Sequence, residues 1–280
     1  MQANAQSKLS SRTKLRTVIY ASALLFGVSA LAADTDWIMK PMAPNLDDTA
    51  SLQRGANLYV NFCLGCHSLK HQRYERTADD LGSIPHELME SNVIFTDQKI
   101  GEHIESSMSE EDAKGWFGAA PPDLTMVTRV RSPEWVYNFL LTFYEDTTRP
   151  FGVNNKVFAN VGMPHALLPL QGLQEEVCFG KRPVDLLKSK TAIDQDRVDS
   201  IKGSGDDNCG QLAMKASTGI YSAEEFDQAA FDISNFLHYV GDPTRAERES
   251  LGKYVIGFLL ILLVLAYFLN RNYWKDVKSD

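Results

Sequence analysis

The residues that most clearly indicate a specific chemistry are two cysteines and a histidine that lie within five positions. The segment Cys63-Leu64-Gly65-Cys66-His67 has the pattern C-x-x-C-H, which is typical of the attachment site of a c-type haem. Cysteines three positions apart on a helix or tight turn face the same way, so both thiols can add to the vinyl groups of one porphyrin. His67 can place an imidazole nitrogen on the iron. We therefore expect one covalently attached haem c.

Two other sites share part of this pattern. A structural zinc site needs a second pair of ligands at similar spacing, and the sequence contains no such pair. A thioredoxin-like redox pair has no use for the adjacent histidine. The haem interpretation is favoured over both.

The sixth iron ligand decides whether a haem carries electrons or binds small molecules. Met163 stands between Gly162, which lets the backbone approach a flat ligand, and Pro164, which favours an extended path before it. A methionine that only fills space in the core stays an open alternative. Met126 is expected on the apolar side of a short helix and Met89 in a polar stretch. The other candidates are His71, His86, His103, His165, His238, Met108 and Met214.

The N-terminus is typical of a secretory signal peptide. A basic region is followed by an apolar run over residues 18–31 and by the small residues Ala30 and Ala32, so we expect residues 1–32 to be removed after Ala32. An uncleaved anchor is the alternative, but the apolar run is short for a membrane span. The basic residues are Lys8, Arg12, Lys14 and Arg16.

A second apolar run near the C-terminus predicts a membrane anchor. Residues 254–269 carry no charge and would span about 24 Å as a helix, and Lys253 can extend the span by snorkelling. Because the run is apolar all round, a membrane helix over 246–272 is favoured over a buried core helix. The numbers of Lys and Arg residues on the two sides of this helix are equal, so the charge of the flanking segments does not settle its orientation in the membrane. The signal peptide instead predicts a cytoplasmic tail at 273–280.

The region between signal and anchor, residues 33–245, is long enough for one exported domain. The whole chain has a net charge of −8, and removal of the four basic residues of the signal leaves −12. This acidity argues against nucleic acid and suits either solubility or a basic protein partner. Cys178 and Cys209 remain after haem attachment; in an exported domain they predict a disulfide, with two free thiols as the alternative.

Several segments carry a resemblance to the cytochrome c1 family, in the family's order. They are the approach from Arg54-Gly55 to the C-x-x-C-H site, Arg73-Tyr74, the segment Ala120-Pro121-Pro122-Asp123-Leu124-Thr125 with Arg129 and Arg131 after it, Gly162-Met163-Pro164, and the C-terminal helix and anchor. The likeness spans nearly all of the chain after the signal. Two departures are the segment 170–217, which has no place in the general family pattern, and Trp135, where a tyrosine is more usual.

The resemblance implies a mainly α, cytochrome c-like haem domain with long irregular loops and one C-terminal transmembrane helix. It implies that His67 and Met163 are the axial ligands. Arg131 would contact a haem propionate, with Tyr74 as a weaker candidate. Pro121 and Pro122 would pack on the His67 side of the ring.

For function, the resemblance implies an electron-transfer subunit of the ubiquinol–cytochrome c reductase (cytochrome bc1) complex that is no enzyme on its own. Its partners would be cytochrome b, the Rieske iron–sulfur protein, a cytochrome c acceptor and membrane lipid, in a dimeric complex without nucleic acid. The haem domain would lie in the periplasm, on the bacterial inner membrane. The alternatives are an oxidase-linked membrane-anchored cytochrome and, from another class, a haem sensor or peroxidase with an open distal site.

Overall fold

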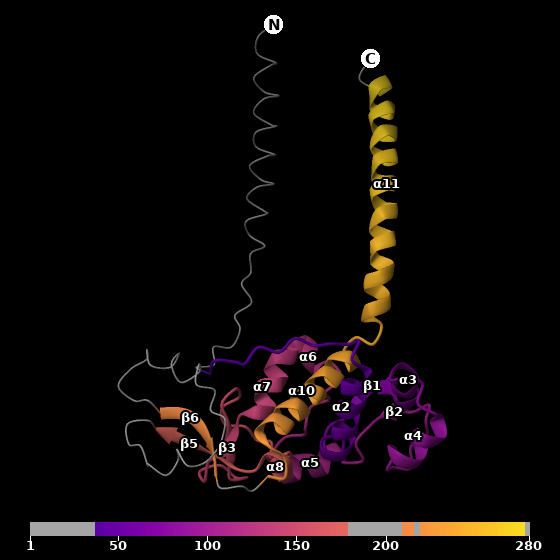
Figure 1. The fold of residues 1–280 in the computed structure, drawn as a ribbon. Coiled ribbons are helices and arrows are strands. Elements are labelled where there is room, and N and C mark those ends of the chain that lie inside the picture. Colours follow the sequence, from indigo (N-terminus) through magenta and orange to yellow (C-terminus); the bar gives the residue numbers. More distant parts are fainter. Residues whose placement is uncertain (1–36, 179–208, 216–218, 278–280) are drawn as a thin grey trace, which may run out of the picture. The chain divides into compact units, whose positions relative to one another are not determined.

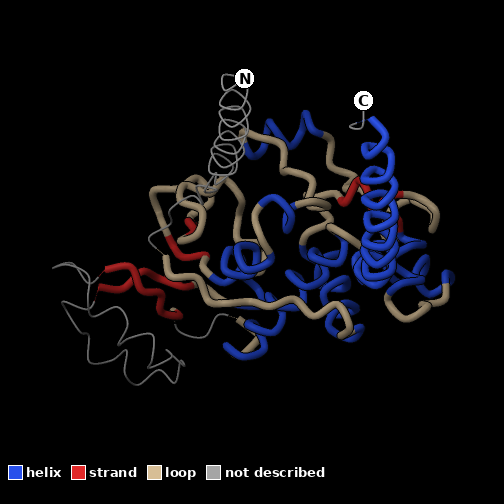
Figure 2. Tube along the Cα trace, turned by 90° about the horizontal axis from the view of Figure 1, so that it is seen from above, coloured by secondary structure: helices blue, strands red, loops and turns tan. Residues whose placement is uncertain are grey.

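The computed structural model describes residues 37–178, 209–215 and 219–277. This part of the chain is mainly helical, with strands only in short antiparallel pairs (Figures 1 and 2), which confirms the predicted fold class. The expected signal peptide and residues 179–208 of the expected insertion lie outside the described residues.

The described residues form the following helices and strands, in chain order. They are α2 (Thr49–Phe62), β1 (Leu69–Arg73), α3 (Tyr74–Asp80), α4 (His86–Asn92), β2 (His103–Ile104), α5 (Glu110–Phe117), α6 (Val127–Val130), α7 (Pro133–Leu141), β3 (Phe143–Glu145), β4 (Val153–Asn155), α8 (Leu168–Gln171), β5 (Gln174–Cys178), β6 (Cys209–Met214), α10 (Ala223–Val240) and α11 (Arg245–Val277). Helix α10 lies centrally among them and packs against α2, α6, α7 and α8.

The helices that form the core begin at side-chain caps. Asp48 accepts a hydrogen bond from the backbone N–H of Ser51 at the start of α2. At the start of α10, Ser222 and Glu225 form a reciprocal capping box. Helix α7 begins with Ser132 as its cap and Pro133 in its first turn. These caps satisfy N–H groups that a helix start would otherwise leave unpaired.

Helices α2 and α10 cross at very short distance because Gly55 has no side chain. A Cβ at this position would lie 2.0 Å from the carbonyl oxygen of Asp232 and 2.8 Å from the Cβ of Phe236. No side chain fits there without displacement of backbone. Around the crossing, Tyr59 and Ile233 are almost completely buried, so the contact anchors the main apolar core.

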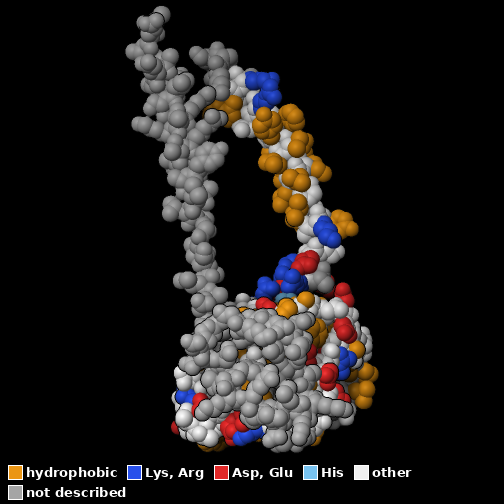
Figure 3. Space-filling model, turned by 60° about the vertical axis from the view of Figure 1, so that its left-hand side comes forward, with side chains coloured by type: hydrophobic (Ala, Val, Ile, Leu, Met, Phe, Trp, Pro, Cys, Tyr) orange, Lys and Arg blue, Asp and Glu red, His pale blue; other side chains and the backbone are white. Residues whose placement is uncertain are grey.

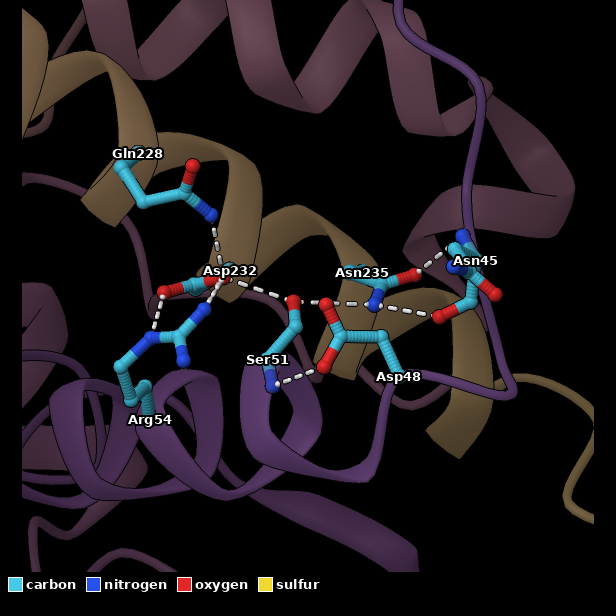
Figure 4. Close-up of polar contacts among 7 residues, drawn as sticks. All are labelled: Asn45, Asp48, Ser51, Arg54, Gln228, Asp232 and Asn235. Atoms are coloured by element: carbon cyan, nitrogen blue, oxygen red, sulfur yellow. Dashed lines mark hydrogen bonds and ion pairs between the residues drawn. The ribbon is translucent and has the colours of Figure 1, made fainter.

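A buried polar network lies beside this crossing (Figure 4). The carboxylate of Asp232, 1% exposed, accepts hydrogen bonds from Ser51 Oγ at 2.6 Å, Arg54 Nε at 2.6 Å and Gln228 Nε2 at 2.9 Å. Asn235 donates to the carbonyl of Asn45 and to Ser51. Since an unpaired buried carboxylate is costly, this set of donors specifies which turn of α10 faces α2.

The strands form local pairs. Strand β1 pairs with β2, β3 with β4, and β5 with β6, each antiparallel. In the last pair the register sets Cys178 opposite Cys209. Backbones of directly opposite antiparallel residues lie within the span of a disulfide, so the pairing is compatible with the predicted bond, which stays a prediction.

Helix α11 has the length and composition of a membrane span. The most apolar 18-residue window within its segment Glu247–Lys275 has a mean hydropathy of 2.2, and none of that window is buried. Figure 3 shows hydrophobic side chains along its middle and Lys or Arg toward both ends. A long helix with an apolar surface and no protein cover is suited to lipid.

We predict that Gly55→Ala destabilises the full-length chain in detergent by about 3 kcal/mol, because the new methyl group must separate α2 from α10. Thermal unfolding followed by circular dichroism measures the change. The matched control is Gly115→Ala in α5, where a Cβ meets nothing within 4 Å; it should be neutral or stabilising by up to about 1 kcal/mol. Equal stability of the two variants would contradict the close crossing.

Candidate haem-binding site

The C-x-x-C-H segment forms the turn that follows α2. The backbone N–H of Cys63 donates to the carbonyl of Tyr59, and the N–H groups of Cys66 and His67 both donate to the carbonyl of Cys63. The Tyr59 hydroxyl, fully buried, donates to the carbonyl of His67. Helix and turn thus hold the two cysteines and the histidine as one unit, as the spacing predicts.

His67 is oriented by a backbone carbonyl. Its Nδ1 lies 2.7 Å from the carbonyl oxygen of Pro122. A carbonyl oxygen only accepts, so Nδ1 carries the proton and the lone pair lies on Nε2. Burial lowers the pKa of His67, while the Pro122 carbonyl and Asp123 act in the opposite direction. The neutral ring with a free Nε2 lone pair is the form that binds a metal.

The two cysteines fit covalent attachment. Both are free thiols rather than a disulfide. Burial raises the pKa of Cys63 to about 12 and also raises that of Cys66, so both stay protonated and the turn carries no thiolate charge. Two free thiols and one correctly oriented imidazole on a single turn fit the groups that a c-type haem requires.

The segment that carries Pro122 is fixed to the residues just after His67. The Asp123 carboxylate accepts hydrogen bonds from the N–H of Lys70 at 2.7 Å and the N–H of Thr125 at 3.0 Å. The N–H of Leu124 donates to the carbonyl of Ser68. Pro121 is half-buried and Pro122 is exposed. The segment is therefore positioned to present the Pro122 carbonyl to His67.

A row of aromatic contacts leads from this segment toward the methionine loop. The Arg131 guanidinium lies 5.2 Å from the ring centre of Trp135, and Trp135 stacks on Phe139 at 5.1 Å. Phe139 meets Phe143 edge-on, also at 5.1 Å, and Phe143 stacks on His165 at 4.8 Å. Two of these aromatic residues, Phe139 and Phe143, were not singled out from the sequence, although positions 135 and 139 share one face of α7.

Met163 lies at the end of this row. Its half-buried side chain packs against a small cluster of Phe143, Val153 and Val161. The loop before it is held by the Arg149 guanidinium, which donates to the carbonyl of Asn160 at 2.7 Å. Such a braced loop suits a ligand that must be presented in a fixed position.

The structure places two of the other methionines differently from what the sequence predicts. Met126 was expected on an apolar helix side, but it precedes α6 and is 46% exposed. Met89 was expected in a polar stretch, yet it is buried and lines a cavity of about 290 Å³ between α2, α3 and α4. Amphipathic α4 turns its one methionine inward. Tyr74 lines the same cavity, and its hydroxyl donates to Gln98 Oε1.

Comparison with known proteins identifies the family of the chain. A model of the Cytochrome C1 family matches residues 37–177 and 220–277, which leaves out most of the expected insertion. The chain is 44% identical over 265 residues to cytochrome c1 of Allochromatium vinosum, which covers 94% of this chain and 100% of that protein.

Two further relatives are more distant. The ammonia monooxygenase gamma subunit of Nitrosomonas europaea is 35% identical over 82% of this chain and 85% of its own length. Cytochrome c1 of Rhodobacter capsulatus is 21% identical over 83% of this chain and 85% of its own length. From the family match and the first relative, this chain belongs to the cytochrome c1 family, whose membership implies a c-type haem.

Proposed function

We propose that this chain carries single electrons from the Rieske iron–sulfur protein to a cytochrome c acceptor within the cytochrome bc1 complex. The observation that supports it most is the bond from His67 Nδ1 to the Pro122 carbonyl, which leaves the Nε2 lone pair free beside two free thiols. Family membership supplies the context of a bc1 complex with cytochrome b.

The chain's own residues would hold the haem from both sides. Cys63 and Cys66 bind its vinyl groups and His67 and Met163 bind the iron, while the haem itself supplies the one-electron couple of ferric and ferrous iron. The soft thioether of Met163 favours the ferrous state and raises the potential. A high potential suits a carrier that takes electrons from an iron–sulfur centre and passes them to another cytochrome.

Residues around the haem would neutralise its propionates and cover its ring. Arg131 lies exposed above Trp135 and is free to pair with a propionate, which needs a cationic partner when buried. Pro121 and Pro122 would cover the His67 side. Tyr74 is a less suitable propionate ligand, because its hydroxyl already donates to Gln98.

The proposed setting is the bacterial inner membrane. The expected signal peptide directs residues 33–245 to the periplasm, α11 crosses the bilayer beside cytochrome b, and the C-terminal tail stays cytoplasmic. The chain does no bond chemistry alone: quinol oxidation and proton translocation belong to the dimeric complex. The acidic surface would favour approach of a basic acceptor.

Met163→Leu should remove the methionine-to-iron charge-transfer band of the oxidised protein and lower the midpoint potential by about 0.2 V, because axial ligands span roughly 0.8 V. The haem should stay attached, since Cys63 and Cys66 are unchanged. Optical redox titration and a haem stain after denaturing electrophoresis measure both.

The matched control is Met89→Leu, which replaces a buried methionine in another cavity and should leave band and potential unchanged. An unchanged potential in Met163→Leu would place the sixth ligand elsewhere. Ready binding of carbon monoxide by the reduced native protein would instead favour a sensor or peroxidase with an open distal site.

We also propose that Cys178 and Cys209, which face each other in the β5–β6 register, form a disulfide. Peptide mass spectrometry of the periplasmic form without reduction should recover the two cysteines as one cross-linked pair, which reductant separates. Recovery of both as alkylated thiols before reduction would contradict the bond. The double Ser variant should lose stability by about 3 kcal/mol.

A further inference from the structure

The joint between α10 and α11 is held by a buried carboxylate. Asp242, two residues beyond the end of α10, is 9% exposed. It accepts hydrogen bonds from the Arg248 guanidinium, Nη1 to Oδ1 at 3.0 Å and Nη2 to Oδ2 at 2.5 Å. Such a two-point pair fixes direction as well as distance. Arg248 lies in the first turn of α11, so the pair secures the base of the anchor helix.

The same carboxylate also faces α6. Arg129 Nη1 lies 3.6 Å from Asp242 Oδ2. Beside it, a Cβ on Gly241 would lie 3.1 Å from Thr128 Oγ1, and that hydroxyl donates to the carbonyl of Leu237. Helix α6 is therefore packed directly on the end of α10, and Asp242 is shared between α6 and α11.

Helix α6 continues the segment that orients His67. The N–H of Val127 donates to the carbonyl of Leu124, and Asp123 and Pro122 come immediately before. A short path of contacts thus runs from the anchor helix through Asp242 and α6 to the Pro122 carbonyl. Each step is a hydrogen bond, an ion pair or close packing of a short helix.

We infer that Asp242 is a positioning residue that fixes the haem at a set orientation to the membrane anchor, by holding α11 and the His67-orienting segment together. The hydrogen bonds from Arg248, together with the charges of Arg248, Arg129 and Arg245, lower the pKa of Asp242, so the carboxylate is charged at neutral pH and both ion pairs are formed. The inference rests on the proposed haem attachment. It makes Asp242 important for electron delivery without giving it any contact with the iron.

A second ion pair at this joint provides a matched control. Arg245 Nε donates to Glu249 at 2.8 Å, and both residues belong to α11, so this pair does not connect α11 to α6. Arg245 also donates to His238 Nε2 at 2.9 Å, a contact that does not involve Glu249. Glu249→Gln removes a nearby negative charge but leaves every hydrogen bond and ion pair of the Asp242 carboxylate in place.

The test is Asp242→Asn in the intact membrane complex, studied by electron paramagnetic resonance of oriented membranes. We expect a broader spread of haem orientation to the membrane normal and about a tenfold slower reduction of this haem by quinol. The midpoint potential and the methionine-to-iron band should not change. Glu249→Gln should match the native protein in every measurement.

Arg248→Leu keeps Asp242 paired with Arg129 and releases only the anchor helix. It should reproduce the orientational spread, and it decides the question if Asp242→Asn does not accumulate. Native orientation in either variant would overturn the inference. So would a shifted potential with native orientation, which would mean that Asp242 acts on the iron. Loss of covalent haem in the native chain would instead refute the proposed function.

Discussion

The close crossing of α2 and α10 is the constraint on which the rest of the structure depends. Helix α2 ends directly at the C-x-x-C-H turn, so its placement determines where Cys63, Cys66 and His67 lie. That placement is set by the missing side chain at Gly55, which lets α2 contact the backbone of Asp232. The polar network around Asp232 gives the contact a single register, because shifting α10 by one turn would leave a buried carboxylate without its donors.

Beyond this crossing, α10 supports two different parts of the candidate site. Its C-terminal end receives α6 and, through α6, the segment whose carbonyl orients His67. Helix α10 also packs on α7, the helix that carries Trp135 and Phe139 toward the methionine loop. One helix near the end of the chain thus organises both sides of a site whose ligands all come earlier in the sequence.

How much could be predicted from the sequence follows from this arrangement. The turn at C-x-x-C-H, the long apolar C-terminal helix and the mainly helical class depend on local patterns, and the structure agrees with them. The Gly55 crossing joins residues about 180 positions apart, and no local pattern reports such a contact. Met89 and Met126 were misplaced for the same reason: their exposure depends on which neighbours tertiary packing brings to short helices.

The two sides of the proposed haem site are held by different kinds of contact, and this difference bears on how the redox potential could be tuned. On the His67 side, helix, turn and backbone carbonyls hold the histidine, and the two cysteines proposed for covalent attachment belong to the same rigid unit. On the Met163 side, the loop depends on side-chain bonds, such as Asn154 Oδ1 accepting from the N–H of Asn160, and on packing against Phe143. Under the proposed ligation, substitutions in such a loop would alter the methionine–iron bond without releasing the haem. The proposed site therefore separates control of the potential from control of attachment.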